Sequence, residues 1–171
     1  MSDESANVQK LIDECDRLMR LFDDAGIYSV AIGSLAMRKL GLPRVPKDID
    51  IAIDRQLPLA RKILESDGYV KVGFVGLTFE KAGFSVDLIF ETMAFPIKEV
   101  KAYDYDQLPP GVEHPSKFGS RCGWATAEGL ILSKSKLDEE KHKNDIAELT
   151  RLIQGGKGES LGHGFCLTRP A

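Results

Sequence analysis

Two short apolar segments carry carboxylates at positions where a β-strand would otherwise be buried. The first, Asp48–Ile53, alternates acidic and apolar residues and then becomes fully apolar, and the second, residues 84–91, holds Asp87 between apolar neighbours. Aspartate is depleted in strands, and a buried carboxylate is costly unless it is paired or bound to a cation. These two segments therefore predict two strands of one sheet whose carboxylates have a chemical task.

The spacing within the first segment places its two acids together. Side chains alternate along a strand, so Asp48 and Asp50 are expected on one face with their Cβ atoms about 7 Å apart. Two carboxylates at that distance repel unless a cation lies between them. Mg²⁺ is commonly held by one or two carboxylates plus substrate phosphates, so the pair predicts a metal clamp, with Mn²⁺ as an alternative ion.

Asp87 extends this hypothesis to three carboxylates. If its strand neighbours the strand of Asp48 and Asp50, the three acids converge and can support a two-metal site for in-line phosphoryl displacement. Asp87 could then also accept the proton of an attacking hydroxyl. A single Asp-x-Asp pair is common at solvated strand ends, so the hypothesis requires that all three acids share a face.

A Gly33-Ser34 turn precedes the acids and lies between a predicted strand, Ile27–Ile32, and a short helix that Gly41 ends. A turn into a helix presents backbone N–H groups to an anion, and glycine lets a phosphate approach closely. Taken alone, such a turn is more often an ordinary helix N-cap. Followed by Asp-x-Asp on the next strand, it predicts a phosphate cradle beside the metal clamp.

The rest of the chain predicts one α+β (or α/β) domain with a mixed sheet flanked by helices. Longer helices are expected at about Glu4–Asp24, at residues 57–69, and from Ala127 to about Ile153 after the N-cap residue Thr126, with Leu137 as a candidate break in the last one. Three short strands are expected within residues 69–91. The domain is predicted to span residues 1–153, with a core at about 27–95, C-terminal helices at about 126–153, and a flexible tail at 154–171.

Composition excludes several classes of protein. The net charge of −3 over 171 residues argues against non-specific nucleic-acid binding. Three cysteines without CxxC spacing disfavour a disulfide framework or a structural zinc site. The N-terminus is polar and no apolar run approaches the roughly 18 residues of a membrane helix, so a soluble, cytoplasmic protein is expected.

The order and spacing of these motifs resemble the DNA polymerase β-type nucleotidyltransferase superfamily. Ile32-Gly33-Ser34 is similar to its Gly-Ser motif, Asp48-Ile49-Asp50-Ile51 to its paired acids, and Val86-Asp87-Leu88 to its third acid. Residues 44–47 resemble the basic lead-in of small bacterial and archaeal members, with Pro46 in place of the usual Thr or Ser. Residues 127–149 resemble the helical lysine region of the abortive-infection and antibiotic nucleotidyltransferase-like branch.

The resemblance implies an NTP bound through two Mg²⁺ ions and transfer of an NMP to a hydroxyl, a phosphate or a protein side chain. It implies that Asp48, Asp50 and Asp87 are the catalytic and metal-binding residues. The nucleotide-binding residues that it implies are Gly33, Ser34, Arg44, Lys47 and Lys134.

The sequence is compatible with functions other than nucleotidyl transfer. The same fold could be a non-catalytic nucleotide-binding module or a toxin–antitoxin-type module with a protein partner or as a homodimer, and a metal-dependent nuclease is a third hypothesis. A second Asp-x-Asp pair, Asp104 and Asp106, is a weaker rival to the first. Lys39 is expected to be a surface charge, Trp124 to be a packing anchor, and Asp145 to pair with a lysine or touch the acceptor.

Overall fold

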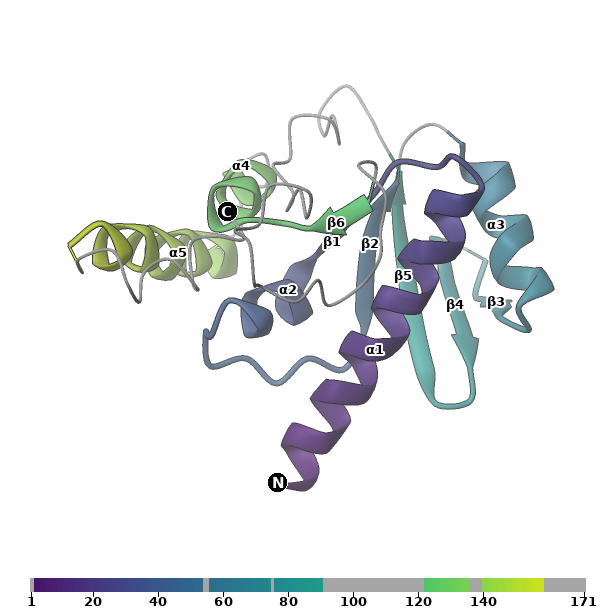
Figure 1. Ribbon diagram of the computed structural model, residues 1–171, viewed down its shortest axis with the longest axis horizontal. Coiled ribbons are helices and arrows are strands. Elements are labelled where there is room, and N and C mark those ends of the chain that lie inside the picture. The colour runs from purple at the N-terminus through teal and green to yellow at the C-terminus, as the bar shows by residue number, and fades with distance from the viewer. Residues whose placement is uncertain (1, 54–55, 75, 91–121, 136–139, 159–171) are drawn as a thin grey trace, which may run out of the picture.

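The computed structural model describes residues 2–53, 56–74, 76–90, 122–135 and 140–158, which form a mixed sheet flanked by helices (Figure 1). The strands are β1 (Ser29–Ile32), β2 (Ile49–Ile53), β3 (Val70–Val72), β4 (Thr78–Lys81), β5 (Phe84–Phe90) and β6 (Cys122–Trp124). The helices are α1 (Asp3–Asp24), α2 (Gly33–Lys39), α3 (Leu57–Ser66), α4 (Ala127–Ser135) and α5 (Glu140–Gly158). This arrangement confirms the predicted fold class.

The strand order is β3-β4-β5-β2-β1-β6, so the two acid-bearing strands are neighbours. β2 pairs parallel with β5 and antiparallel with β1, and β6 joins the far side of β1 in parallel. Parallel neighbours need a crossover connection, which α3 and the β3–β4 strands provide here. As a result, β2 and β5 run in the same direction, and their N-terminal ends lie side by side.

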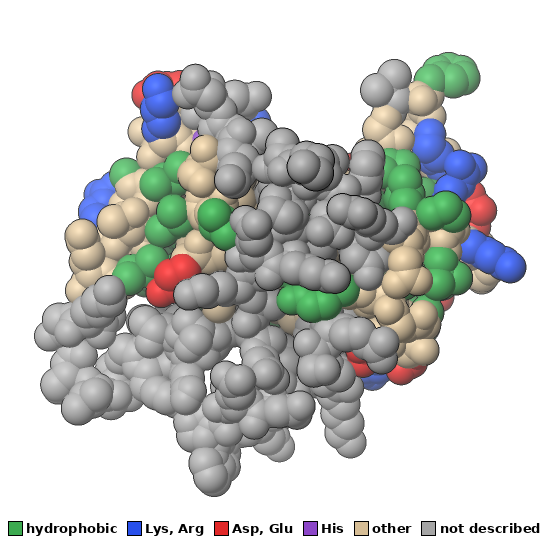
Figure 2. Space-filling model, turned by 90° about the horizontal axis from the view of Figure 1, so that it is seen from above, with side chains coloured by type: hydrophobic (Ala, Val, Ile, Leu, Met, Phe, Trp, Pro, Cys, Tyr) green, Lys and Arg blue, Asp and Glu red, His purple; other side chains and the backbone are tan. Residues whose placement is uncertain are grey.

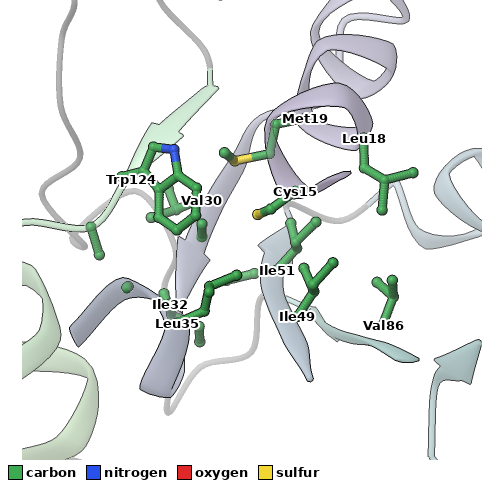
Figure 3. Close-up of a cluster of buried hydrophobic side chains, with 14 of the residues drawn as sticks. Cys15, Leu18, Met19, Val30, Ile32, Leu35, Ile49, Ile51, Val86 and Trp124 are labelled. Atoms are coloured by element: carbon green, nitrogen blue, oxygen red, sulfur yellow. The ribbon is translucent and has the colours of Figure 1, made fainter. Parts of the chain in front are cut away.

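Helix α1 covers one face of the sheet and closes the hydrophobic core (Figures 1 and 3). Its apolar stripe packs against strand residues such as Ile49 and Ile51, both fully buried. Burying an aliphatic side chain of this size contributes roughly 1.5–3 kcal/mol, so the stripe fixes which face of β2 points inward. The core-facing residues of α1 are Val8, Leu11, Cys15, Leu18, Met19 and Phe22.

Several element boundaries differ from the sequence prediction. Helix α2 begins at Gly33 itself, and β2 begins at Ile49, so Asp48 lies in a bend just before the strand. The C-terminal helical segment consists of two helices, and α5 continues to Gly158, five residues beyond the predicted helix end at Ile153. A glycine inside a formed helix costs only about 1 kcal/mol relative to alanine, so Gly155 does not end α5.

Figure 2 shows that the described basic, acidic and hydrophobic side chains are interspersed on the face seen from above. None of the helices in the described segments combines the length and the apolar character needed to cross a lipid bilayer.

Candidate active site

Asp50 and Asp87 lie directly opposite each other on adjacent parallel strands. They are register partners between β2 and β5, and neighbouring strands lie about 4.8 Å apart. Their sequence neighbours Ile49, Ile51 and Val86 are fully buried on the side of α1, whereas both aspartates are half-buried. Because side chains alternate along a strand, Asp50 and Asp87 share the face of the sheet that points away from α1.

The electrostatics of Asp50 reflect this crowding. Burial, followed by the negative charges of Asp87 and Asp48, raises the pKa of Asp50 to about 6, while Lys134 acts in the opposite direction. Asp48 is exposed in the bend before β2, yet its charge reaches Asp50. The charges of Asp48 and Asp87 therefore both act on Asp50.

Gly33 lies against the Asp50 carboxylate. It follows Ile32, the register partner of Asp50, and opens α2 with a φ of +73°. A Cβ atom at this position would lie 2.1 Å from Oδ2 of Asp50, well inside van der Waals contact. The backbone conformation and the close contact both require glycine, so the predicted Gly-Ser turn abuts the acid pair.

Thr78 contacts Asp87 from the other side, although the sequence reading did not identify it. It is the β4 register partner of Asp87, and its hydroxyl donates a hydrogen bond to Oδ1 of that carboxylate. One signal could have found it: β4 and β5 are joined by the two-residue turn Ala82-Gly83. Placing that turn fixes the hairpin register and puts Thr78 opposite Asp87.

Two predicted nucleotide-binding cations converge on Asp145 of α5. Nζ of Lys134 donates to Oδ2 of Asp145 at 2.8 Å, and Arg44 donates to Oδ1 at 2.8 Å. Arg44 also forms an ion pair with Glu148 at 3.0 Å. Burial raises the pKa of Asp145, but the hydrogen bonds from Lys134 and Arg44 outweigh burial and hold it below its ordinary value. The expected pairing of Asp145 with a lysine is confirmed.

The donor set fits a divalent cation that is completed by substrate. Within the described residues, no group of three or more His, Cys, Asp or Glu side chains is arranged as a metal-binding cluster. Mg²⁺, however, is commonly bound by one or two carboxylates together with phosphates of a nucleotide. The paired oxygens of Asp50 and Asp87 match that mode, with Asp48 beside them, whereas a cage made of protein alone does not form.

Comparison with known proteins identifies the architecture. No family model and no curated protein sequence matches the chain. An antigenic nucleotidyltransferase-like protein from Paracoccidioides brasiliensis superposes with a TM-score of 0.54 at 14% identity, over 85% of this chain and 76% of that one. The antibiotic-resistance factor ANT(2'')-Ia, in its solution structure, superposes with a TM-score of 0.53 at 16% identity, over 97% and 91%.

The chain has a nucleotidyltransferase-like fold. At these identities the likeness concerns the fold alone. Within this nucleotidyltransferase-like fold, Asp50, Asp87 and Gly33 are brought together by direct strand pairing and contact. Lys134 interacts electrostatically with Asp50.

Lys47 lies in a different setting from the other predicted site residues. It is exposed, and it lines a cavity of about 600 Å³ between the start of α1 and the β4–β5 hairpin, together with Lys10 and Phe84. Phe84 lies two residues before the buried Val86 on β5, so both side chains are on the same face of the sheet. The cavity therefore lies toward the α1 side of the sheet. Its role in binding nucleotide stays a prediction.

Lys39 corrects one expectation of the sequence reading. It is half-buried rather than a free surface charge, and its Nζ lies 4.2 Å from the centre of the Trp124 ring. Burial lowers the pKa of Lys39. Trp124 is 1% exposed and donates from Nε1 to Oδ1 of Asp16 at 2.7 Å, so its role as a packing anchor is confirmed. The rival acids Asp104 and Asp106 lie outside the described residues.

Proposed function

We propose that this protein is a metal-dependent nucleotidyltransferase that transfers an NMP from an NTP to a hydroxyl, a phosphate or a protein side chain. The observation that carries the proposal is the direct pairing of Asp50 and Asp87 on the sheet face that points away from α1. Two like charges at that separation destabilise each other, which is a poor arrangement for stability and a suitable one for a cation. The raised pKa of Asp50 is consistent with a site that awaits positive charge.

The acids have distinct tasks in this proposal. Asp48, Asp50 and Asp87 would hold Mg²⁺, which when bound neutralises charge on the triphosphate and acts as a Lewis acid at phosphorus. Asp87 accepts the proton of the acceptor hydroxyl as its oxygen forms a bond to the α-phosphorus. The bond from the α-phosphorus to the bridging oxygen breaks, and pyrophosphate leaves with that electron pair.

The remaining groups bind and orient the nucleotide. The Gly33 backbone lies against the Asp50 carboxylate, and the N–H groups of Gly33 and Ser34 at the start of α2 would donate to a phosphate oxygen. Lys134 and Arg44 supply positive charge, and a triphosphate would compete with Asp145 for both of them. Holding the reactants in line is a large part of catalysis in phosphoryl transfer.

The test is transfer of α-labelled nucleotide. Each of the four NTPs is incubated with Mg²⁺ and a panel of acceptors that carry hydroxyl, phosphate or protein groups, and label on the acceptor is counted. We expect transfer by the wild type, dependence on Mg²⁺, and loss in Asp87→Asn. Asp67→Asn is the matched control, because it makes the same change to a carboxylate outside the site and should retain transfer.

The alternative function predicts a different result in the same assay. A non-catalytic nucleotide-binding or toxin–antitoxin-type module would bind an NTP, measured by calorimetry, without moving label to any acceptor. A nuclease would shorten DNA or RNA in the presence of Mg²⁺. If the wild type binds no Mg²⁺–NTP, the proposed nucleotidyltransferase function is wrong.

A further inference from the structure

The Asp87 carboxylate lies between two neighbours across the sheet. Asp50 is its register partner on β2, and Thr78 is its register partner on β4 (Figure 1). The three residues form one row across three adjacent strands. An ionised carboxylate can only accept hydrogen bonds, so the Thr78 hydroxyl is the donor to Oδ1 of Asp87.

The backbone around Thr78 holds its hydroxyl in place. The backbone N–H of Leu88 donates to the carbonyl of Leu77 at 3.0 Å, which extends the β4–β5 pairing beyond Thr78. The next residue, Phe79, is fully buried on the opposite face and is the register partner of Val86. A one-residue slip of β4 would expose Phe79, so the position of Thr78 is strongly specified.

The chemistry of threonine adds to this rigidity. A β-branched side chain has few accessible χ1 rotamers, so its hydroxyl is a stiff donor. A hydrogen bond to a carboxylate is charge-assisted and stronger than one between neutral groups. Without such a bond, the Asp87 carboxylate would be free to rotate away from the negative charge of Asp50.

We propose that Thr78 is a positioning residue, which fixes Oδ1 of Asp87 and so presents Oδ2 to the metal ion and to the acceptor proton. This inference rests on the function proposed above and adds a residue to that site. Thr78 touches neither substrate nor metal. It acts through the orientation of Asp87.

Two substitutions separate the hydroxyl from the shape of the side chain. Thr78→Val keeps the branched shape and removes the donor, whereas Thr78→Ser keeps the donor. At saturating Mg²⁺, we expect kcat of Thr78→Val to fall about 10- to 100-fold with little change in KM for the NTP, because a misplaced catalytic group affects the transition state. Thr78→Ser should restore most of kcat.

A second measurement does not depend on turnover. Binding of Mn²⁺ in the presence of ATP, followed by electron paramagnetic resonance, should weaken about tenfold in Thr78→Val and recover in Thr78→Ser. Thr150→Val is the matched control, since the Thr150 hydroxyl donates to the Ile146 carbonyl at 2.7 Å on α5, away from the acids. It should leave both kcat and Mn²⁺ binding unchanged.

The outcomes separate this inference from the proposed function. If Thr78→Val equals the wild type in both measurements, or if Val and Ser variants lose function equally, the positioning role is wrong. If the wild type transfers no label but Mn²⁺–ATP binding weakens in Val and recovers in Ser, the transferase proposal fails and the positioning role stands. A wild type that binds Mn²⁺ together with none of the four NTPs overturns both.

Discussion

Two groups of carboxylates in this molecule are built in opposite ways. On the side of α1, Asp67 accepts hydrogen bonds from Arg17 at 2.9 and 2.5 Å and from Lys81 at 3.1 Å. These partners, Arg17 foremost, lower the pKa of Asp67 to about 2. Asp50 instead faces Asp87 and Asp48, and burial together with these charges raises its pKa to about 6.

The difference separates a structural role from a functional one. Arg17 also binds Glu14, which accepts from the Tyr69 hydroxyl at 2.6 Å, so α1 is tied to the segment after α3 by matched charges. Asp48, Asp50 and Asp87 together carry negative charge that Lys134 does not neutralise, because Lys134 is already paired with Asp145. The fold tolerates this destabilising arrangement around Asp50, which supports the proposal that a cationic ligand binds there.

The largest effect should come from Asp50→Asn, which removes one of the three carboxylates of the proposed site. We expect nucleotidyl transfer to fall about 10³-fold or more, since loss of a metal-binding carboxylate removes several kcal/mol of transition-state stabilisation. Thermal stability in metal-free buffer should rise rather than fall, because a repulsion is removed. Transfer assays and melting curves measure the two effects, and a stable variant with full activity would contradict the assignment.

Gly33→Ala tests the close contact between Gly33 and the Asp50 carboxylate. Its methyl group would meet Oδ2 of Asp50, so we expect transfer to fall about 100-fold and the free energy of unfolding to fall by about 1–3 kcal/mol. Gly41→Ala is the matched control. Gly41 has a φ of +92° but nothing within 4 Å of its Cβ position, so it should lose stability alone. Equal loss of transfer in both variants would show that backbone strain, rather than contact with Asp50, is responsible.

Asp67→Asn weakens the ion pairs of Asp67 with Arg17 and Lys81. Unlike Asp50→Asn, it should lower stability and leave transfer unchanged. We expect the free energy of unfolding to fall by about 1 kcal/mol, a modest value because Arg17 and Lys81 are both partly exposed. Transfer should be unchanged when measured well below the melting temperature. Chemical denaturation gives the free energy, and a loss of transfer without loss of stability would break the distinction between the two groups.

The smallest effects should appear as opposite dependences on pH. Asp67 has a lowered pKa in the folded protein, so its stabilisation is present above about pH 4 and is lost as pH falls toward 2. Asp50 has a raised pKa, so the folded state holds a proton that the unfolded state has released, and stability falls as pH rises from about 4 to 6. Denaturation of the wild type and the two Asn variants in metal-free buffer measures both, and slopes of the same sign would contradict the comparison.

The sequence predicted the acid pair because its information is local and strong. Alternation in Asp48–Ile53 and the apolar run of residues 84–91 predicted two strands, and the aspartates in them led to the hypothesis of a shared face. Thr78 was missed because its importance arises only from the register of the β4–β5 hairpin, which pairing across the chain creates. Lys39 was misjudged because a helix surface charge and a charge packed on Trp124 look alike until β6 is placed beside β1.

The parallel pairing of β2 with β5 has a consequence for how the chain tolerates change. The separation of Asp50 and Asp87 is set by one strand lying beside another, and not by the length of the connection between them. Insertions between α3 and β3 would therefore leave both carboxylates where they are, whereas a single residue inserted within β5 before Asp87 would turn that carboxylate into the core. An insertion between α3 and β3 that spares Asp67 and the buried Tyr69 would therefore preserve the acid pair, whereas an insertion in β5 would not.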